Sequence, residues 1–147
     1  MSNNFQVYRS SAGSGKTYTL ALNYIALALR GGEYGAVDYY RKILAITFTN
    51  KAASEMKERV LSYFSCLSKN EDIDGILNWL QDKTGLGDHI IFQRSAIIHR
   101  HILHNYADLG ISTIDKFTYK LVRTFASDLG LSHNFELEMD NYNIIQP

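Results

Sequence analysis

Residues 11–17 of this 147-residue chain read Ser11-Ala12-Gly13-Ser14-Gly15-Lys16-Thr17, and they are the strongest indication of its fold class. A short apolar stretch over residues 5–9 precedes this segment, and a helix-compatible run over residues 17–30 follows it. Its glycines allow backbone conformations that are closed to other residues, so that successive N–H groups can point at phosphate oxygens. The positive end of the following helix dipole would face the same anion. The stretch therefore predicts a strand, a nucleotide-binding phosphate loop (P-loop) and a helix, in that order.

The loop and the first turn of the helix hold the predicted nucleotide contacts. Lys16 would supply a point charge to the β- and γ-phosphates, and the Thr17 hydroxyl would bind Mg²⁺ as the one predicted metal ligand. We predict these two residues as the catalytic ones. The pattern G-x-x-x-x-G-K-[ST] requires glycine at the position of Ser10. The sequence departs from the pattern there, although serine is also a small residue. The full set of predicted cofactor contacts is Ala12, Gly13, Ser14, Gly15, Lys16, Thr17 and Tyr18.

Composition and charge narrow the class of protein further. Apolar residues make up 46% and charged residues 20%, which is typical of a globular domain. Lys plus Arg and Asp plus Glu number fifteen each, so a nucleic acid would have to be held by a local site. Cys66 is the single cysteine, which excludes an internal disulfide and fits a cytoplasmic location. No apolar run is long enough to cross a membrane, so we expect no membrane partner.

The apolar pattern predicts strands and helices in alternation. The run over residues 42–48 is nearly continuous, as in a buried parallel strand, and Thr49 or Asn50 is placed to cap the helix that follows. Alternation of this kind predicts an α/β fold with a three-layer parallel sheet. We expect one domain over residues 1–147 with a helical segment at about 66–108. The predicted strands are 5–9, 42–48, 109–114 and 135–139, and the predicted helices are 17–30, 50–65, 71–81, 88–107 and 116–129.

Two further segments carry a family resemblance. They are Ile46-Thr-Phe-Thr-Asn-Lys-Ala-Ala53, continued by residues 55–59, and Ile111-Ser-Thr-Ile-Asp-Lys-Phe117. Together with the loop at 11–17, they resemble in order and character the first three motifs of superfamily 1 DNA helicases of the UvrD/Rep type. Within that group the chain looks closest to the RecB/AddA-like branch of helicase–nucleases.

The resemblance implies a fold, cofactors and partners. It implies a P-loop NTPase (RecA-like) fold, of which this chain would be the incomplete N-terminal part of the first motor domain. It also implies ATP and Mg²⁺ as cofactors and single-stranded DNA as the partner, in recombination and DNA repair. The expected protein partners are the remaining helicase domains, a nuclease domain of the parent chain and a second nuclease subunit.

The segment after the 42–48 strand is the first candidate for DNA contact. Open α/β sheets place their ligand sites at the carboxyl ends of strands. An exposed aromatic ring at that edge can stack on any unpaired base, and a helix start can donate to a phosphate. The resemblance implies that this segment lines the single-strand path. The candidates are Phe48, Thr49, Asn50 and Lys51; the alternative is a core phenylalanine followed by a helix cap.

The segment at 111–117 is the second candidate. The resemblance implies contacts to the DNA backbone here, and Thr113 and Lys116 could make them. Many relatives have a small hydroxyl residue where this chain has Lys116. Asp115 has an alternative interpretation as the N-cap of the next helix.

A feature that hydrolysis requires is missing from the sequence. Nucleotide hydrolysis of this type needs an acidic pair to hold Mg²⁺ and orient water, and no run of four apolar residues is followed by Asp-Glu. We therefore expect an N-terminal fragment of an ATP-dependent DNA helicase, inactive in unwinding by itself. The alternatives are a complete small P-loop kinase acting on a nucleotide or small molecule, and a non-catalytic binding module.

Overall fold

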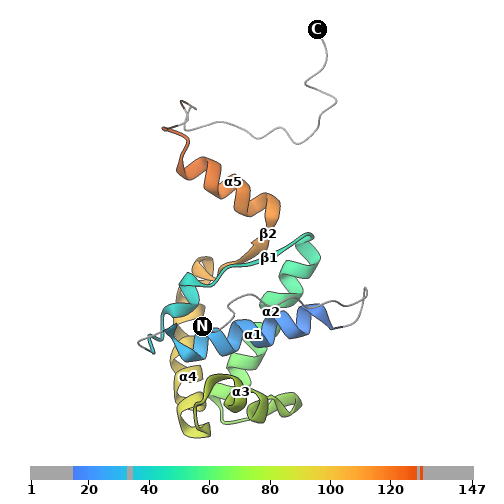
Figure 1. The fold of residues 1–147 in the computed structure, drawn as a ribbon, viewed down its shortest axis with the longest axis vertical. Helices are drawn as coiled ribbons and strands as arrows, with labels where there is room; N and C mark the ends of the chain where they lie inside the picture. Colours follow the sequence, from blue (N-terminus) through green and yellow to red (C-terminus); the bar gives the residue numbers. More distant parts are fainter. Residues whose placement is uncertain (1–14, 33–34, 129, 131–147) are drawn as a thin grey trace, which may run out of the picture.

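The computed structural model describes residues 15–32, 35–128 and 130. Four α-helices, α1 to α4, pack together; a short parallel strand pair lies beside them, and α5 lies on the far side of that pair (Figure 1). The elements in chain order are α1 Lys16–Arg30, η2 Tyr39–Lys42, β1 Ala45–Thr47, α2 Asn50–Ser68, η3 Ile73–Gly75, α3 Ile76–Thr84, α4 Asp88–His104, η4 Tyr106–Asp108, β2 Ile111–Thr113 and α5 Ile114–Thr124.

Helix α1 confirms the helix expected at 17–30, and glycines bound it at both ends. Gly31 adopts the left-handed conformation (φ 68°) and its N–H donates to Leu27 O, a common way for a helix to end. Arg94 of α4 holds the same end from the side, since its Nη1 donates to Leu29 O at 2.6 Å and to Arg30 O at 3.2 Å. The carbonyls left without partners at the end of α1 are thus bound by a cation, which also suits the negative end of the helix dipole.

Helix α2 is the central element of the helical core. Thr49 is its N-cap, because its Oγ1 accepts a hydrogen bond from the Ala52 N–H at 3.1 Å. The helix extends to Ser68, three residues beyond the expected end. Its apolar side is buried against α1 and α4. The most buried side chains of the core are Tyr40, Phe64, Ile25, Leu29, Met56, Leu67, Ile76, Leu80, Ile91, Ile98, Ile102 and Ile111.

The helices expected at 71–81 and 88–107 are present with shifted ends. The first is α3, which starts only at Ile76 because Asp74 and Gly75 both have positive φ and interrupt a helical path. Asp72 Oδ1 instead accepts from the Leu77 N–H at 3.0 Å and satisfies an amide of the new first turn. The second, α4, stops at His104. Over residues 66–108 the described chain thus consists of the end of α2, the helices α3 and α4, and the short turns η3 and η4.

Strands β1 and β2 pair in parallel, with Ala45, Ile46 and Thr47 opposite Ile111, Ser112 and Thr113. They match the centres of the strands expected at 42–48 and 109–114. Gly110 allows the two segments that lead into β1 and β2 to come close together, since a Cβ at Gly110 would clash with the Ile43 carbonyl oxygen. Its own carbonyl accepts the Ala45 N–H at 2.8 Å.

The described residues thus form a mixed α/β structure with a small parallel sheet and mostly helices. The strands expected at 5–9 and 135–139 lie outside the described residues, so the three-layer sheet stays a prediction. Helix α5 starts at Ile114, two residues before the expected start at Lys116, and its last helical residue is Thr124 rather than residue 129. No helix in the described ranges is long and apolar enough to span a bilayer.

Candidate nucleotide and DNA site

Gly15 stands directly before α1 and has a left-handed backbone (φ 79°, ψ 15°) that residues with a Cβ rarely adopt. Lys16 and Thr17 are the first two residues of the helix; Lys16 is exposed and Thr17 is half-buried. Among the described residues no side chain caps this end, and the Thr19 N–H donates to Gly15 O at 2.9 Å, four residues back. The start of α1 therefore fits an anion such as phosphate. The predicted contacts Ala12, Gly13 and Ser14 lie outside the described residues.

Tyr18 packs its ring against α2. The Arg59 guanidinium lies 5.6 Å from the Tyr18 ring centroid, and the ring of Tyr63 meets Tyr18 edge-on at 6.4 Å. Tyr63 in turn donates its hydroxyl to Asp74 Oδ2 at 2.8 Å. Burial, and then the bond to Asp74, raise the pKa of Tyr63 to about 12. The ring of Tyr18, which we predicted as a cofactor contact, is thus held in place by side chains of α2.

The carboxyl end of β1 presents the first set of predicted DNA contacts. Phe48 is 89% exposed, which excludes the alternative of a core phenylalanine. Asn50 and Lys51 are exposed in the first turn of α2. Thr49 is exposed as well, but its hydroxyl is the cap of α2. A flat apolar face and a positively polarised helix start therefore lie next to each other at this edge.

The second set lies beside the first, because Thr47 and Thr113 are partners in the parallel pair. Thr113 is buried and caps α5, its Oγ1 accepting the Lys116 N–H at 3.3 Å. The interpretation of Asp115 as the cap is thus wrong, and Asp115 lies exposed in the first turn. Lys116 is exposed. Two helices with threonine caps therefore begin at the same edge of the sheet.

Helix α2 connects the two candidate sites. It starts at the DNA edge, at Asn50, and carries Arg59 nine residues further along. At a rise of 1.5 Å per residue that separation is about 14 Å. Arg59 then contacts Tyr18 in the first turn of α1. One rigid element thus reaches from the candidate phosphate site to the candidate DNA edge.

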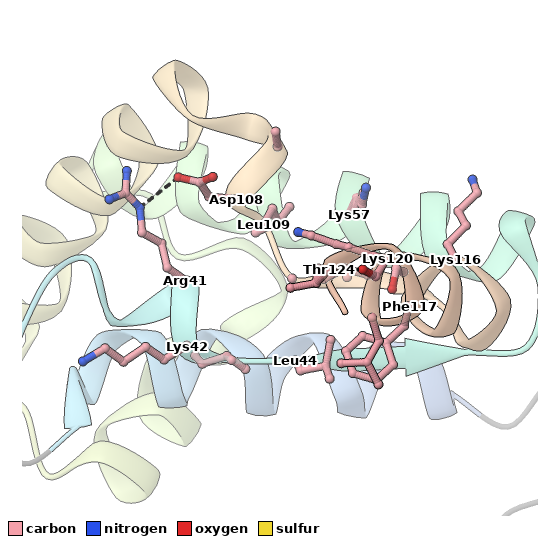
Figure 2. Close-up of a pocket in the computed structure, with 16 residues that line it drawn as sticks. Arg41, Lys42, Leu44, Lys57, Asp108, Leu109, Lys116, Phe117, Lys120 and Thr124 are labelled. Carbon is pink, nitrogen blue, oxygen red and sulfur yellow. Dashed lines mark hydrogen bonds and ion pairs between the residues drawn. The ribbon is translucent and has the colours of Figure 1, made fainter. Parts of the chain in front are cut away.

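A groove of about 670 Å³ lies between α5 and the β1–β2 pair, and Figure 2 shows it in close-up. We call it the α5 groove; its walls include Leu44, Phe117, Lys120 and Leu121. Lys116 lies at its right end in Figure 2 and the pair formed by Arg41 and Asp108 at its left end.

Sequence reasoning named the candidate site residues but could not say how the elements that carry them are connected. It gave no role to Arg59, although Arg59 and Tyr63 are four residues apart and so share one face of α2. That spacing was the available signal, but the sequence could not pair the face with Tyr18. Within the described ranges no group of three or more His, Cys, Asp or Glu side chains could hold a metal ion. The Thr17 hydroxyl stays the predicted Mg²⁺ ligand.

Comparison with known proteins gives a family match. The sequence model of the family described as "UvrD/REP helicase N-terminal domain" matches residues 2–144. The chain is 29% identical to "RecBCD enzyme subunit RecB" of Haemophilus influenzae over 155 positions, which cover 97% of this chain. It is 31% identical to one component of an ATP-dependent helicase/nuclease of Streptococcus suis over 134 positions, covering 89% of the chain. "ATP-dependent DNA helicase Rep" of Escherichia coli is 57% identical over 51 positions, 35% of the chain.

The matches cover a small part of each relative. The chain spans 12% of the RecB protein, 9% of the Streptococcus suis protein and 7% of the Rep helicase. No solved structure gives a significant match.

Proposed function

The chain belongs to the UvrD/REP helicase N-terminal domain family, and from this premise we propose that it is the ATP-binding part of an ATP-dependent translocase on single-stranded DNA. The observation that carries the proposal is the pairing of β1 with β2, which sets two helix starts side by side at one sheet edge, next to the exposed ring of Phe48. A parallel pair of this kind supports a RecA-like sheet. Within the described residues, nothing favours the alternative of a small kinase.

The nucleotide site would be formed by the residues around the start of α1. ATP supplies the phosphoanhydride bond, and Mg²⁺ neutralises charge on its phosphates. The backbone at Gly15 and the first-turn amides would bind phosphate oxygens, and the Lys16 ammonium would oppose their charge. The Thr17 hydroxyl would be an Mg²⁺ ligand, in keeping with the few protein ligands that this ion takes. Ala12, Gly13 and Ser14 would complete the loop.

The DNA edge would hold a single strand without reading its sequence. Phe48 would stack on a base, and the exposed Asn50, Lys51 and Lys116 would bind phosphates. Thr49 and Thr113 use their hydroxyls as helix caps. Their contribution would therefore be to orient the amides of α2 and α5 toward the strand. Because the whole chain has no net charge, such binding depends on this local arrangement.

In the intact enzyme, we infer that α2 relates the two sites. Arg59 contacts the turn that carries Lys16 and Thr17, and the other end of α2 carries the DNA contacts. A shift of the first turn on nucleotide binding would move α2 as a body, since packed helices transmit displacement. For the whole protein, the proposal includes DNA unwinding. It also includes a second motor domain, a nuclease domain and a second subunit.

A titration with a fluorescent ATP analogue and Mg²⁺ tests the proposal. We expect saturable binding by the chain and at least a tenfold loss in Lys16→Ala, since bonds to a charged group contribute about 1.5–3 kcal/mol. Lys69→Ala is the matched control, because Lys69 is an exposed lysine at the other end of α2. A single-stranded oligonucleotide should change the affinity for the analogue. Binding that is equal in the wild type and in Lys16→Ala would overturn the nucleotide site.

A further inference from the structure

Asp74, the middle residue of the turn η3, has a left-handed backbone (φ 60°, ψ 13°), which costs free energy in a residue with a Cβ. Among the described residues other than glycine, only Asn70 shares a positive φ. Asn70 has a local reason, because it directly follows the C-cap of α2 and its N–H donates to Leu67 O at 3.1 Å, a common way for a helix to end. Asp74 ends no helix, so its conformation needs another cause.

The carboxylate of Asp74 supplies that cause. Its Oδ2 accepts a hydrogen bond from the Tyr63 hydroxyl at 2.8 Å, eleven residues back in the chain. Asp74 is exposed and lines a cleft of about 340 Å³ beside α2, so water could solvate its carboxylate in many other orientations. The left-handed backbone therefore accompanies a contact that solvation of Asp74 does not require. Strained residues of this kind occur where the geometry of a functional site has to be fixed.

The turn η3 does not depend on Tyr63 to hold the start of α3. The Leu77 N–H donates to Asp72 Oδ1 at 3.0 Å, a hydrogen bond from within the turn. Gly75, the N-cap of α3, adopts its own left-handed conformation (φ 65°) without the cost that a Cβ brings. The effect of the bond between Asp74 and Tyr63 is therefore to be sought at Tyr63.

Tyr63 extends the contact to the start of α1. It is 2% exposed, and its ring meets the Tyr18 ring edge-on, with 6.4 Å between the centroids and 78° between the planes. The energy of such a pair depends on the orientation of the two rings. A bond at the hydroxyl, the outer end of the side chain, restricts the tilt of the Tyr63 ring. Tyr18 follows Thr17 in the first turn of α1, so the ring of Tyr63 helps to orient that turn.

We propose that Asp74 is a positioning residue of the nucleotide site. Through Tyr63 and Tyr18 it orders the first turn of α1, which carries the predicted phosphate and Mg²⁺ contacts. This role rests on the proposed function, because it requires that ATP phosphates bind at the start of α1. The bond to Tyr63 orders the turn before the ligand arrives, so that binding spends less free energy on ordering it.

Titration with the fluorescent ATP analogue and Mg²⁺ tests this role in the full chain. Asp74→Gly relieves the left-handed backbone but loses the carboxylate, and Asn70→Gly is the matched control that relieves the same conformation elsewhere. Asp74→Asn keeps an oxygen that can accept the Tyr63 hydroxyl. We expect the affinity to fall about fivefold in Asp74→Gly and to stay within about twofold of the wild type in the other two variants. Urea unfolding would first establish conditions in which every variant is folded.

A double variant separates positioning from a general loss of structure. Tyr63→Phe keeps the ring but loses the hydroxyl, so it should lower the affinity about as much as Asp74→Gly does. Because Asp74 acts through Tyr63, the two changes together should cost no more than either one alone. Additive losses, or equal affinities of Asp74→Gly and Asn70→Gly, would overturn the positioning role.

The failure of this role and the failure of the proposed function have different signatures. Lys16→Ala is titrated alongside, and wild-type affinity in that variant would remove the nucleotide site itself and the role of Asp74 with it. The link from Asp74 to Tyr18 is also measurable without nucleotide, because the NMR signals of the Tyr18 ring protons sense the neighbouring ring of Tyr63. Asp74→Gly should shift these signals and Asn70→Gly should not. Unshifted signals in Asp74→Gly would contradict the positioning role whatever Lys16→Ala shows.

Discussion

The guanidinium of Arg59 lies over the ring of Tyr18, with 5.6 Å between its central carbon and the ring centroid. Tyr18 follows Thr17 in the first turn of α1, and Arg59 stands in the middle of α2. Tyr63, one turn further along α2, meets the same ring at an interplanar angle of 78°. Two side chains of one helix thus fix the start of another, which is where the phosphate site would form.

We expect Arg59→Ala to loosen this contact. Arg59 is exposed, and a cation over an aromatic face at an exposed site contributes about 0.5–1 kcal/mol, so the free energy of unfolding should fall by about that amount. Affinity for the ATP analogue should fall several-fold, since the first turn is less well held. Arg59→Lys should keep part of both. Urea unfolding and analogue titration are the measurements, with Arg100→Ala, an exposed arginine of α4, as the control. An Arg59→Ala variant as stable as this control would contradict the prediction.

Gly110→Ala should disrupt the strand pair. A Cβ at Gly110 would clash with the carbonyl oxygen of Ile43, a backbone atom that cannot turn away as a side chain can. Overpacking of this kind costs about 1–3 kcal/mol. Gly87→Ala is the matched control, because a Cβ at Gly87 meets nothing within 4 Å. Hydrogen exchange of the Ala45 amide, which donates to Gly110 O, would report the loss locally. Slow exchange of that amide in Gly110→Ala would show that the pair tolerates the Cβ.

Local signals in the sequence predicted the helix ends that depend on one residue. Gly31 ends α1 through its left-handed backbone, and Thr49, one of the two expected cap candidates beside Asn50, caps α2 through its hydroxyl. Both effects act within a few residues, so the sequence contains them. The predicted start of α3 was wrong by five residues. The positive φ of Asp74 depends on tertiary contacts, which composition does not reveal. Asp74 accepts the hydroxyl of Tyr63, a partner on another helix.

The candidate site shows the same limit. Its residue types could be predicted, because a P-loop pattern and an aromatic residue after an apolar strand are local. The register that places Thr47 opposite Thr113 could not be predicted, since it depends on the approach of Gly110 to Ile43 across more than sixty residues of chain. The role of Arg59 depends on how α2 packs on α1, which periodicity alone does not determine.

Phe48→Ala should separate DNA binding from stability. The side chain is 89% exposed, so its removal should change the free energy of unfolding by less than about 0.5 kcal/mol. Stacking of one base is worth about 1–3 kcal/mol, so the affinity for a single-stranded oligonucleotide should fall about tenfold. Leu103→Ala is the control, because Leu103 is 61% exposed on α4, away from the sheet edge. Fluorescence anisotropy of a labelled oligonucleotide would measure the affinity, and equal affinities for both variants would exclude a stacking role.

The pKa of Tyr63 predicts a loss of stability at high pH. Burial, and then the bond to Asp74, raise this pKa from its ordinary value of 10 to about 12. The folded chain therefore keeps a proton that the unfolded chain releases, so stability is full below pH 10 and falls as the pH rises toward 12. A shift of that size corresponds to a loss of roughly 3 kcal/mol.

Tyr63→Phe removes this titration, although the buried Tyr24, whose pKa is also raised, still titrates. Urea unfolding between pH 8 and about 12, followed through Trp79 fluorescence, should thus show a smaller loss in Tyr63→Phe than in the wild type. The same loss in both proteins would mean that Tyr63 ionises as readily in the folded chain as in the unfolded one.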